Sequence, residues 1–307
     1  MKRALVVGGS YFVGRVFVEE LIKAGGYEVH VLNRGRIPIR KEGVREHKAD
    51  RHDLARLKEA LPRLSWDVVV DFCAYKPEDV EIMLSALHHA AVGQYIYIST
   101  ASVYGKTDDL PVREDAPKLE GPQPELGPFA DYAFDKLRTE AALDRWCAAV
   151  GVPYTILRPA FIYGKYNYAP RESYFFDLVL KDETVVIPGE RLALFSFVSV
   201  WDVARIAIRC MGNEKTHGSA FNLCAGDLVS YPRLMEVLEI VTGKKVRTRT
   251  MRSAEIVDQG VPLPFPLDEH LVYSGALIAE TLGFMYIPFL EGMKETYKYY
   301  LKGRKAQ

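Results

Sequence analysis

The chain contains 307 residues, and its apolar share of 49% and charged share of 26% are close to the averages for soluble globular proteins. These values exclude a disordered chain, a collagen and a coiled coil. Forty Lys and Arg residues balance forty Asp and Glu residues, so no net charge attracts the chain to nucleic acid or to an anionic membrane.

The N-terminus and the cysteines indicate a cytoplasmic protein. The basic start leads into four apolar residues, Ala4–Val7, which are too few for the core of a signal peptide. No apolar run approaches the length of a membrane span, so we expect no contact with a membrane. The four cysteines form no C-x-x-C pair, as is typical of reduced cysteines in the cytoplasm. There is no H-E-x-x-H motif either, and we expect no metal site.

The first half of the chain alternates between apolar runs and amphipathic segments. Runs rich in β-branched residues predict buried strands at Ala4–Val7, Glu28–Leu32, Asp67–Asp71, Tyr95–Ser99 and Tyr154–Leu157. Helical patterns lie between them, including Val13–Lys23, Pro77–Ala90 and Phe129–Val150. Strands that are apolar on both faces and alternate with helices predict an α/β fold with a doubly wound parallel sheet of the Rossmann type.

The second half is less regular. Asp108–Pro128 is rich in Pro, Gly and acidic residues, which predicts either a loop beside the active site or a plain surface excursion. Later patterns predict further helices and strands, at Trp201–Met211, Ala220–Leu223, Tyr231–Val241, Lys245–Arg249 and Leu290–Leu301. We expect a sheet domain of residues 1–160, to which 196–225 return, and a smaller C-terminal domain of 161–195 and 226–307.

A glycine-rich turn follows the first predicted strand and opens a helix. Such a turn lets backbone N–H groups approach a pyrophosphate, and the helix N-terminus adds a partial positive charge. The sequence therefore predicts a dinucleotide site, although a tight turn without a ligand would give the same pattern. Tyr11 stands where the motif usually has its middle glycine, which predicts local strain or a shifted phosphate contact. The residues assigned to the turn are Gly8, Ser10, Tyr11, Phe12, Val13 and Gly14.

The end of the second predicted strand bears on the choice of dinucleotide. A carboxylate at this point usually binds the adenosine ribose of NAD, but here Asn33 and Arg34 follow the strand. A guanidinium suits a 2′-phosphate, so Arg34 favours NADP over NAD unless it is merely a solvated arginine. Asp50 ends the next predicted strand, where its carboxylate could bind the adenine amino group or cap the following helix.

Hydroxyl groups and a Tyr-Lys pair define the expected catalytic centre. Ser99 and Thr100 lie at the carboxyl end of a predicted parallel strand, where α/β sheets bind their ligands. Tyr132 and Lys136 share one face of a predicted helix at i and i+4. A nearby ammonium and a positive nicotinamide ring would lower the pKa of the tyrosine, which could then exchange a proton with a substrate hydroxyl. Alone, this spacing also fits an ordinary amphipathic helix.

Together these motifs resemble the extended short-chain dehydrogenase/reductase family, the NAD-dependent epimerase/dehydratase group. The similarity covers nearly the whole chain, and it includes Leu157-Arg158-Pro159, Tyr163-Gly164, the helix start at Val200–Ala204 and the strand at Phe221–Leu223. The resemblance implies that the sheet domain binds the dinucleotide and the C-terminal domain the substrate. It implies that Thr100, Tyr132 and Lys136 are catalytic, with Thr100 and Tyr132 on the reacting hydroxyl and Lys136 also on the nicotinamide ribose. Further cofactor contacts are expected from Asn33, Arg34, Asp50, Arg51, Cys73, Ala74, Ser99 and Pro159.

Two departures from the family pattern concern the substrate. Ala101-Ser102 replaces the Asp-Glu pair of the family's 4,6-dehydratases, which argues against dehydration. Nucleotide-sugar epimerases usually have an arginine for the diphosphate seven residues before the conserved Asp, and this chain has Phe195 there. A diphosphate would need another cation. Arg171, Arg191 and the basic run at Lys244–Arg252 are the candidates, and Arg191 is the one expected to bind the substrate.

A related subgroup points to RNA. The glycine turn with Tyr11 and the strand end Asn33-Arg34-Gly35 also resemble the chloroplast stem-loop-binding proteins, which bind RNA and have lost the Tyr-Lys pair. Retention of Tyr132 and Lys136 favours chemistry. The basic run at Lys244–Arg252 fits a solvated strand edge, and a phosphate-bearing substrate or RNA is the alternative.

The sequence thus predicts an NAD(P)-dependent sugar epimerase, with a UDP-hexose 4-epimerase as the first choice. The first alternative is an NADP-dependent reductase or dehydrogenase of a non-nucleotide carbonyl or hydroxyl compound. The second is an RNA-binding protein on the same fold, although the balanced charge makes nucleic acid an improbable partner. We expect a sugar or nucleotide sugar as the small-molecule substrate, and a homodimer is compatible with the sequence.

Overall fold

A computed structural model describes residues 1–87, 92–190 and 192–305. Within these ranges, seven parallel strands form one central sheet in the order β10-β6-β5-β4-β1-β2-β3. This arrangement confirms the doubly wound parallel sheet predicted from the sequence. The strands are β1 (Lys2–Val7), β2 (Tyr27–Asn33), β3 (Val44–Lys48), β4 (Val68–Asp71), β5 (Tyr95–Ile98), β6 (Tyr154–Pro159) and β10 (Ser219–Leu223).

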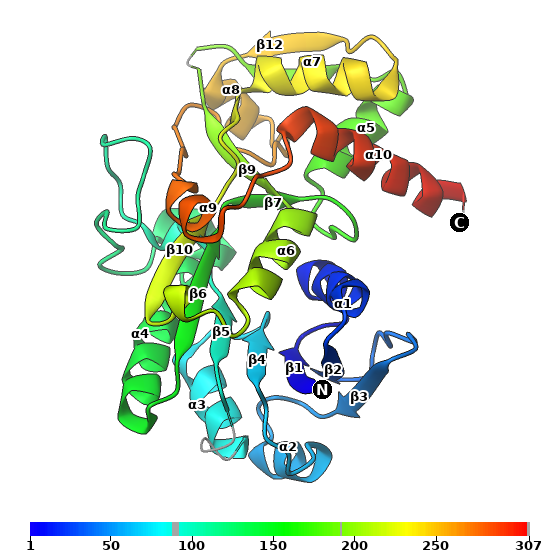
Figure 1. The fold of residues 1–307 in the computed structure, drawn as a ribbon. Coiled ribbons are helices and arrows are strands. Elements are labelled where there is room, and N and C mark those ends of the chain that lie inside the picture. Colours follow the sequence, from blue (N-terminus) through cyan, green and yellow to red (C-terminus); the bar gives the residue numbers. More distant parts are fainter. Residues whose placement is uncertain (88–91, 191, 306–307) are drawn as a thin grey trace.

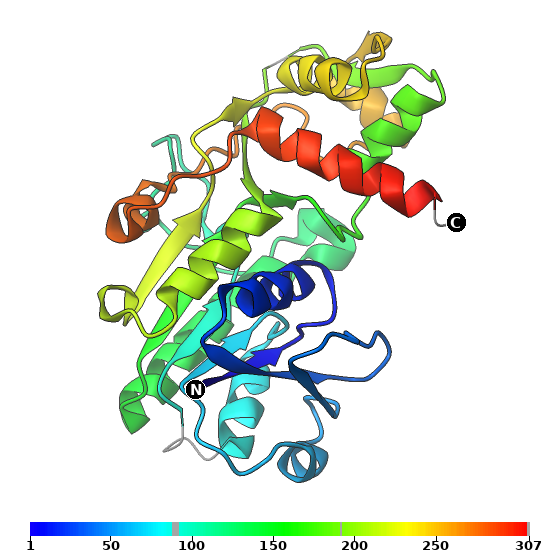
Figure 2. The same cartoon turned by 45° about the vertical axis from the view of Figure 1, so that its right-hand side comes forward.

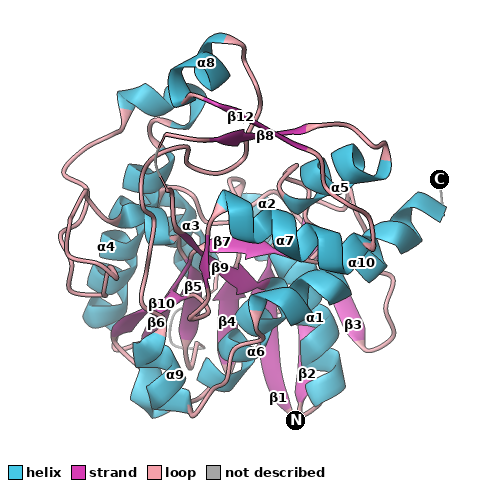
Figure 3. Cartoon of the chain, turned by 90° about the horizontal axis from the view of Figure 1, so that it is seen from above, coloured by secondary structure: helices cyan, strands magenta, loops and turns pink. Residues whose placement is uncertain are grey.

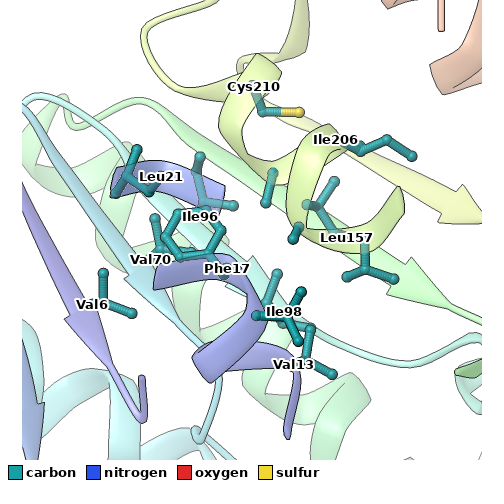
Figure 4. Packing of buried hydrophobic residues seen from close by; sticks show 14 of the residues in the cluster. Val6, Val13, Phe17, Leu21, Val70, Ile96, Ile98, Leu157, Ile206 and Cys210 are labelled. Carbon is teal, nitrogen blue, oxygen red and sulfur yellow. The ribbon is translucent and has the colours of Figure 1, made fainter. Parts of the chain in front are cut away.

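Helices cover both faces of the sheet (Figure 1, Figure 3). One face packs against α1 (Phe12–Ala24) and α6 (Val200–Cys210), and the other against α2 (Leu54–Ala60), α3 (Pro77–Ala86) and α4 (Tyr132–Val150). Each face has its own apolar cluster, as expected for strands that are buried on both sides. Figure 4 shows the first cluster, in which Phe17 of α1 and Ile206 of α6 meet strand residues such as Val6, Ile96 and Leu157.

The strand order reverses beside β1, because β1 pairs with β2 on one side and with β4 on the other. In open α/β sheets such a reversal leaves a crevice at the carboxyl ends of the strands, where ligands bind. The turn after β1 begins at Gly8, and the segment after β4 begins at Phe72. Both segments line a cavity of about 570 Å³.

A second group of elements lies beyond the carboxyl ends of the strands (Figure 1, Figure 2). In the described ranges it contains a three-stranded sheet, β11-β9-β7, and a two-stranded sheet, β12-β8. Its apolar core is rich in aromatic rings and is separate from the two clusters of the central sheet. Its elements are β7 (Phe161–Tyr163), α5 (Glu172–Leu180), β8 (Val185–Pro188), β9 (Phe195–Ser199), β11 (Leu228–Val229), α7 (Tyr231–Thr242), β12 (Thr248–Met251), α8 (Ser253–Asp258) and α10 (Phe289–Lys305). The helix α9 (Ala276–Leu282) instead packs against β10 of the central sheet.

Several predicted boundaries shift in the structure. The long helix begins at Tyr132 rather than at Phe129, because Pro124–Phe129 forms a 3-10 segment with Gly127 in a non-helical conformation. The strand expected over Lys245–Arg249 begins at Thr248. The helix expected over Pro77–Ala90 is seen to Ala86, and the end of that prediction falls on residues 88–91, outside the described residues. No helix in the described part of the chain is long and apolar enough to cross a membrane.

The loop at 108–128 is an excursion that packs on the molecule without reaching the main cavity. None of its residues, all of which are described, lines that cavity, so the loop contributes no side chain to it. Val112 instead forms a bridge with Tyr273 and packs with Val103 and Tyr104. The loop therefore supports the cavity wall at Tyr273 from behind.

Candidate active site

A cavity of about 570 Å³ lies at the carboxyl ends of the central strands. Its walls come from the glycine turn, the ends of β2, β4, β5 and β6, the first turn of α4, the loop before α5, and Leu271 and Tyr273. The sequence-predicted residues that line it are Gly8, Ser10, Tyr11, Phe12, Val13, Gly14, Asn33, Arg34, Asp50, Arg51, Cys73, Ser99, Thr100, Tyr132, Lys136 and Pro159. Ala74 is not among the lining residues, and Arg191 lies outside the described residues.

The glycine turn has the geometry that a dinucleotide requires. Gly8 has a φ of +83°, a conformation that residues with a side chain rarely adopt. A Cβ at Gly14 would lie 2.4 Å from the backbone oxygen of Gly8, so only glycine lets α1 approach the turn this closely. The turn thus leaves its backbone and the start of α1 open to the cavity, which fits a pyrophosphate.

Backbone strain was expected at Tyr11, which replaces the middle glycine, and it is found one residue later, at Phe12. Phe12 has a φ of +34°, which is unfavourable for a bulky residue. Tyr11 precedes α1, and its ring stacks on Tyr168 with centroids 4.9 Å apart. Both rings line the cavity, so the stack connects the glycine turn with the loop before α5.

That loop is also fastened to α1 by polar contacts. Lys165 ion-pairs with the buried Glu19 of α1 at 2.6 Å, and the Tyr166 hydroxyl donates to the same carboxylate at 3.0 Å. The Arg15 guanidinium lies 4.6 Å from the centroid of the Tyr166 ring. Loop and helix therefore face each other across the mouth of the cavity and are joined by several contacts.

At the end of β2 the two predicted residues have different roles. Asn33 is buried and accepts from the backbone N–H of Gly35 at 2.7 Å, while its amide donates to Glu46 at 3.0 Å. Asn33 therefore shapes the loop. Arg34 is exposed at the cavity edge, where its guanidinium remains open to a ligand.

The Arg51 side chain is bonded to groups in the protein interior. Its guanidinium forms two parallel bonds with Asp71, at 3.0 and 2.9 Å, and a third with the carbonyl of Asp79 at 2.8 Å. Burial alone would raise the pKa of Asp71, but the charge of Arg51 and its hydrogen bonds hold that pKa below its ordinary value. Arg51 lines the cavity, yet its described contacts are those of a structural residue.

Asp50 does not cap the following helix, so that alternative was wrong. The cap of α2 is Asp53, which accepts from the backbone N–H of Arg56. The Asp50 carboxylate instead accepts from the backbone and ring N–H groups of His52, both at 3.0 Å. It remains exposed at the same end of the cavity as Arg34.

Thr100, Tyr132 and Lys136 meet at the opposite end of the cavity. Thr100 follows β5, and Tyr132 is the first residue of α4, with Lys136 one turn later. The buried Lys136 Nζ donates to the carbonyls of Ala74 at 2.9 Å and Ile98 at 2.7 Å. Burial lowers the pKa of Lys136 to about 8, although the charges of Asp71 and Glu140 oppose this shift.

The protein groups around Tyr132, without a nicotinamide ring, do not lower the pKa of its phenol. Tyr132 is 41% exposed, but the protein around it still removes water and raises the pKa of its phenol. A hydrogen bond with Thr100 and the charge of Arg171 oppose that rise. Lys136 does not lower it, because its ammonium is directed at the two carbonyls beneath. A ligand charge is therefore needed to bring the phenol toward neutral pH.

Sequence reasoning missed the buried polar chain behind this centre. The Ser99 hydroxyl donates to Glu140, and Glu140 accepts two bonds from Arg158, at 3.0 and 2.6 Å. Arg158 donates to the Tyr104 hydroxyl, which donates to Asn222 of β10. Ser99, predicted to contact the cofactor, thus anchors β5 to α4. The signal was present: Glu140 follows Lys136 by four residues on the same helix face.

The far wall of the cavity is apolar with one cation. Phe161, Ile162 and Leu271 supply apolar surface, and Arg171 supplies a guanidinium. Phe195, at the position where the family pattern has an arginine, is fully buried in the aromatic cluster. The basic run at Lys244–Arg252 contributes no residue to the described lining, and the described residues contain no cluster suited to a metal ion.

Comparisons with known proteins agree with this geometry. The model of the NAD dependent epimerase/dehydratase family matches residues 4–224. The chain is 29% identical to the chloroplast stem-loop binding protein of 41 kDa b of Arabidopsis thaliana, over 96% of this chain and 78% of that protein. It is 26% identical to a UDP-glucose 4-epimerase of Corynebacterium glutamicum, over 80% of this chain and 82% of that protein. The crystal structure of the Thermotoga maritima UDP-glucose 4-epimerase with UDP-glucose superposes with a TM-score of 0.79 at 22% identity, covering 98% of this chain and 99% of that one.

Proposed function

Because this chain belongs to the NAD-dependent epimerase/dehydratase family, we propose that it uses a bound dinucleotide to invert a hydroxyl-bearing carbon of a sugar, with a UDP-hexose as substrate and carbon 4 as the centre. The observation that carries the proposal is the position of Thr100, Tyr132 and Lys136 in the same cavity as the glycine turn. A dinucleotide bound along that turn would reach from Arg34 and Asp50 to Tyr132.

The chain's own residues supply binding and proton transfer. Gly8 and Gly14 admit the pyrophosphate, and two of the three Lys136 N–H groups are fixed by carbonyls, which leaves the third for the nicotinamide ribose. A bound NAD would supply the hydride acceptor for the sugar carbon and the donor that returns the hydride to the opposite face. Tyr132 takes the proton of the reacting hydroxyl and gives it back, while Thr100 holds that hydroxyl in place.

Loss of the dehydratase pair agrees with this reaction. Ala101 and Ser102 form the 3-10 turn after Thr100, and neither offers a carboxyl group. Elimination of water would need an acid and a base at this place. Hydride transfer needs only the dinucleotide and the Tyr132 phenol.

The test is conversion of UDP-galactose to UDP-glucose, followed by proton NMR with a catalytic amount of NAD. An epimerase reaches equilibrium without net reduction of the dinucleotide, whereas the alternative reductase consumes one NADPH for each carbonyl group. Stoichiometric consumption of NADPH would favour the reductase. Failure of UDP-sugars to bind at millimolar concentration would remove the UDP-hexose part of the proposal.

RNA binding is a second candidate, favoured by the similarity to the Arabidopsis stem-loop binding protein. The Lys244–Arg252 run is the surface to test, and salt bridges already occupy two of its members: Arg247 with Asp182, and Arg252 with Glu255. Fluorescence anisotropy with a stem-loop RNA at 50 and 200 mM salt measures this activity. An affinity that falls steeply with salt would support it, since phosphate contacts release counterions.

A further inference from the structure

The cationic side chains around the cavity differ in how many of their N–H groups are already hydrogen-bonded to the protein. Arg51 is bonded to Asp71 and Asp79, and Lys136 to two backbone carbonyls. Arg34 lies at the adenosine end of the proposed dinucleotide site. On the wall formed by residues 159–171 and 271–273, Arg171 is the charged side chain among the described lining residues.

Arg171 is held in place but is not neutralised. Its Nη1 donates to the carbonyl of Ile162 at 3.0 Å, and its guanidinium lies 5.6 Å from the centroid of the Phe161 ring. No carboxylate of the described residues forms an ion pair with it. The neighbouring Glu172 is directed elsewhere, where it accepts from the Gly164 N–H and the Asn167 amide, both at 2.9 Å. The remaining donors of the guanidinium can therefore bind an anion.

Arg171 and Phe195, which stands where the family pattern has an arginine, both contact the Phe161 ring. Phe161 packs edge to face on Phe195, with centroids 6.4 Å apart. Leu271 pairs with Phe195 through the backbone and lines the cavity. Arg171 thus covers the cavity side of a cluster whose interior contains Phe195, and its charge lies on the wall that Phe195 cannot reach.

We propose that Arg171 binds the phosphate group of the substrate and so selects phosphate-bearing sugars. This inference rests on the proposed function, because it takes the cavity beside Tyr132 as the sugar site. The surroundings of Arg171 favour it, since Phe161, Ile162 and Leu271 give the wall apolar surface, and a phosphate–guanidinium contact is stronger beside apolar surface than in bulk water. The charge of Arg171 also acts on the Tyr132 phenol, which places it near the reacting end of the cavity.

Isothermal titration calorimetry of Arg171→Gln and Arg171→Lys against the wild type, each saturated with NAD, tests the inference. For UDP-glucose we expect the Kd of Arg171→Gln to rise roughly 10- to 100-fold, the usual effect of losing a charge-assisted bond. Arg171→Lys should recover part of the loss, because the charge remains while the two-point contact does not. The Kd for NAD should change less than about twofold in both variants, which also reports that they are folded.

Arg247→Gln is the matched control, since it removes one arginine from the basic run outside the described cavity lining. It should bind UDP-glucose like the wild type. Equal losses in Arg247→Gln and Arg171→Gln, or unchanged UDP-glucose binding in Arg171→Gln, would overturn the inference.

Further ligands separate this inference from the proposed UDP-hexose. Glucose 1-phosphate carries a phosphate without the nucleotide, and glucose carries neither. If the wild type binds glucose 1-phosphate but no UDP-sugar, and Arg171→Gln loses that binding, the inference holds while the UDP-hexose proposal fails. If the NAD-loaded wild type binds neither phosphate-bearing ligand at millimolar concentration, the inference is wrong.

Discussion

Tyr132 and Lys136 are separated by one helical turn and meet different surroundings. The lysine lines the cavity but is buried and fixed by two carbonyls, whereas the tyrosine is partly exposed in the cavity. Burial acts on both, lowering the pKa of the lysine and raising that of the phenol. Each shift disfavours the charged form, which is the ammonium of Lys136 and the phenolate of Tyr132.

Replacing Tyr132 with Phe keeps the ring and removes the proton-transferring oxygen. Turnover of the substrate should fall roughly 10²- to 10⁴-fold, the usual scale for loss of a general base. The Kd for NAD should stay near the wild-type value, because Lys136 and the glycine turn remain. Steady-state kinetics and calorimetry measure the two effects. Near-normal turnover would exclude Tyr132 from the reaction.

The pKa of Lys136 predicts a pH dependence of stability. Between pH 8 and about 10.5 the unfolded chain holds a proton on this lysine that the folded chain has lost, so stability rises with pH in this window. The shift from 10.5 to about 8 corresponds to a gain of at most about 3 kcal/mol. Urea unfolding at pH 7.5 and pH 10 should show this gain in the wild type relative to Lys136→Met. Parallel changes in the two proteins would contradict it.

Arg34 is the residue that we expect to decide between the two dinucleotides. Its open guanidinium suits a 2′-phosphate, so Arg34→Ala should weaken NADP binding and leave NAD binding little changed. Calorimetry with both dinucleotides gives the answer. If the wild type prefers NAD and the substitution changes neither affinity, Arg34 is only a solvated loop residue.

At the scale of elements, the approach of α1 to the glycine turn depends on Gly14. A Cβ there would lie 2.4 Å from a backbone oxygen, so Gly14→Ala should destabilise the fold by about 1–3 kcal/mol or more and weaken dinucleotide binding. Gly303→Ala is the control, because a Cβ at this position in α10 meets nothing within 4 Å. Chemical unfolding and calorimetry compare the two. Equal stability of both variants would mean that the turn tolerates a side chain.

The central sheet could be predicted because several of its strands are apolar on both faces. Each of these strands therefore appears in the sequence as a short continuous apolar run. Tyr95–Ile98 and Val68–Asp71 are fully buried and read directly as strands. In contrast, α5 was not foreseen, since Phe175 owes its place to the aromatic cluster rather than to a local period. The role of Arg51 depends on Asp71, twenty residues away, and that of Glu140 on Arg158. Such pairings are made by the fold and are not visible in a local pattern.

At the scale of the whole molecule, the cavity takes its walls from both groups of elements. We propose the division expected from the sequence, with residues 1–160 and 196–225 binding the dinucleotide and 161–195 and 226–307 binding the substrate. The separate aromatic core of the second group supports it. Two elements cross the division. β9 starts at Phe195 in the smaller sheet and leads into α6, which packs on the central sheet, and Ile278 of α9 is buried in the same cluster as α6.

A ligand that contacts both walls should stabilise the whole chain. At NAD concentrations of about 100 times the Kd, binding adds roughly 2.7 kcal/mol, which corresponds to a rise in Tm of several degrees. Differential scanning fluorimetry with 0 to 5 mM NAD measures this rise, and Gly14→Ala should reduce it. An unchanged Tm of the wild type at millimolar NAD would argue against the dinucleotide site.

The stack of Tyr11 on Tyr168 joins the two walls at the mouth of the cavity, and Glu19 fastens the same loop to α1. If a dinucleotide bound along the glycine turn lies beneath the stack, it would leave only after the two rings separate, and its exchange with the surrounding pool would be slow. An epimerase regenerates its oxidised cofactor in every cycle and has no need of that pool. A protein that keeps its cofactor in this way would work at the same rate in oxidising and in reducing surroundings, independent of the cell's ratio of NAD to NADH.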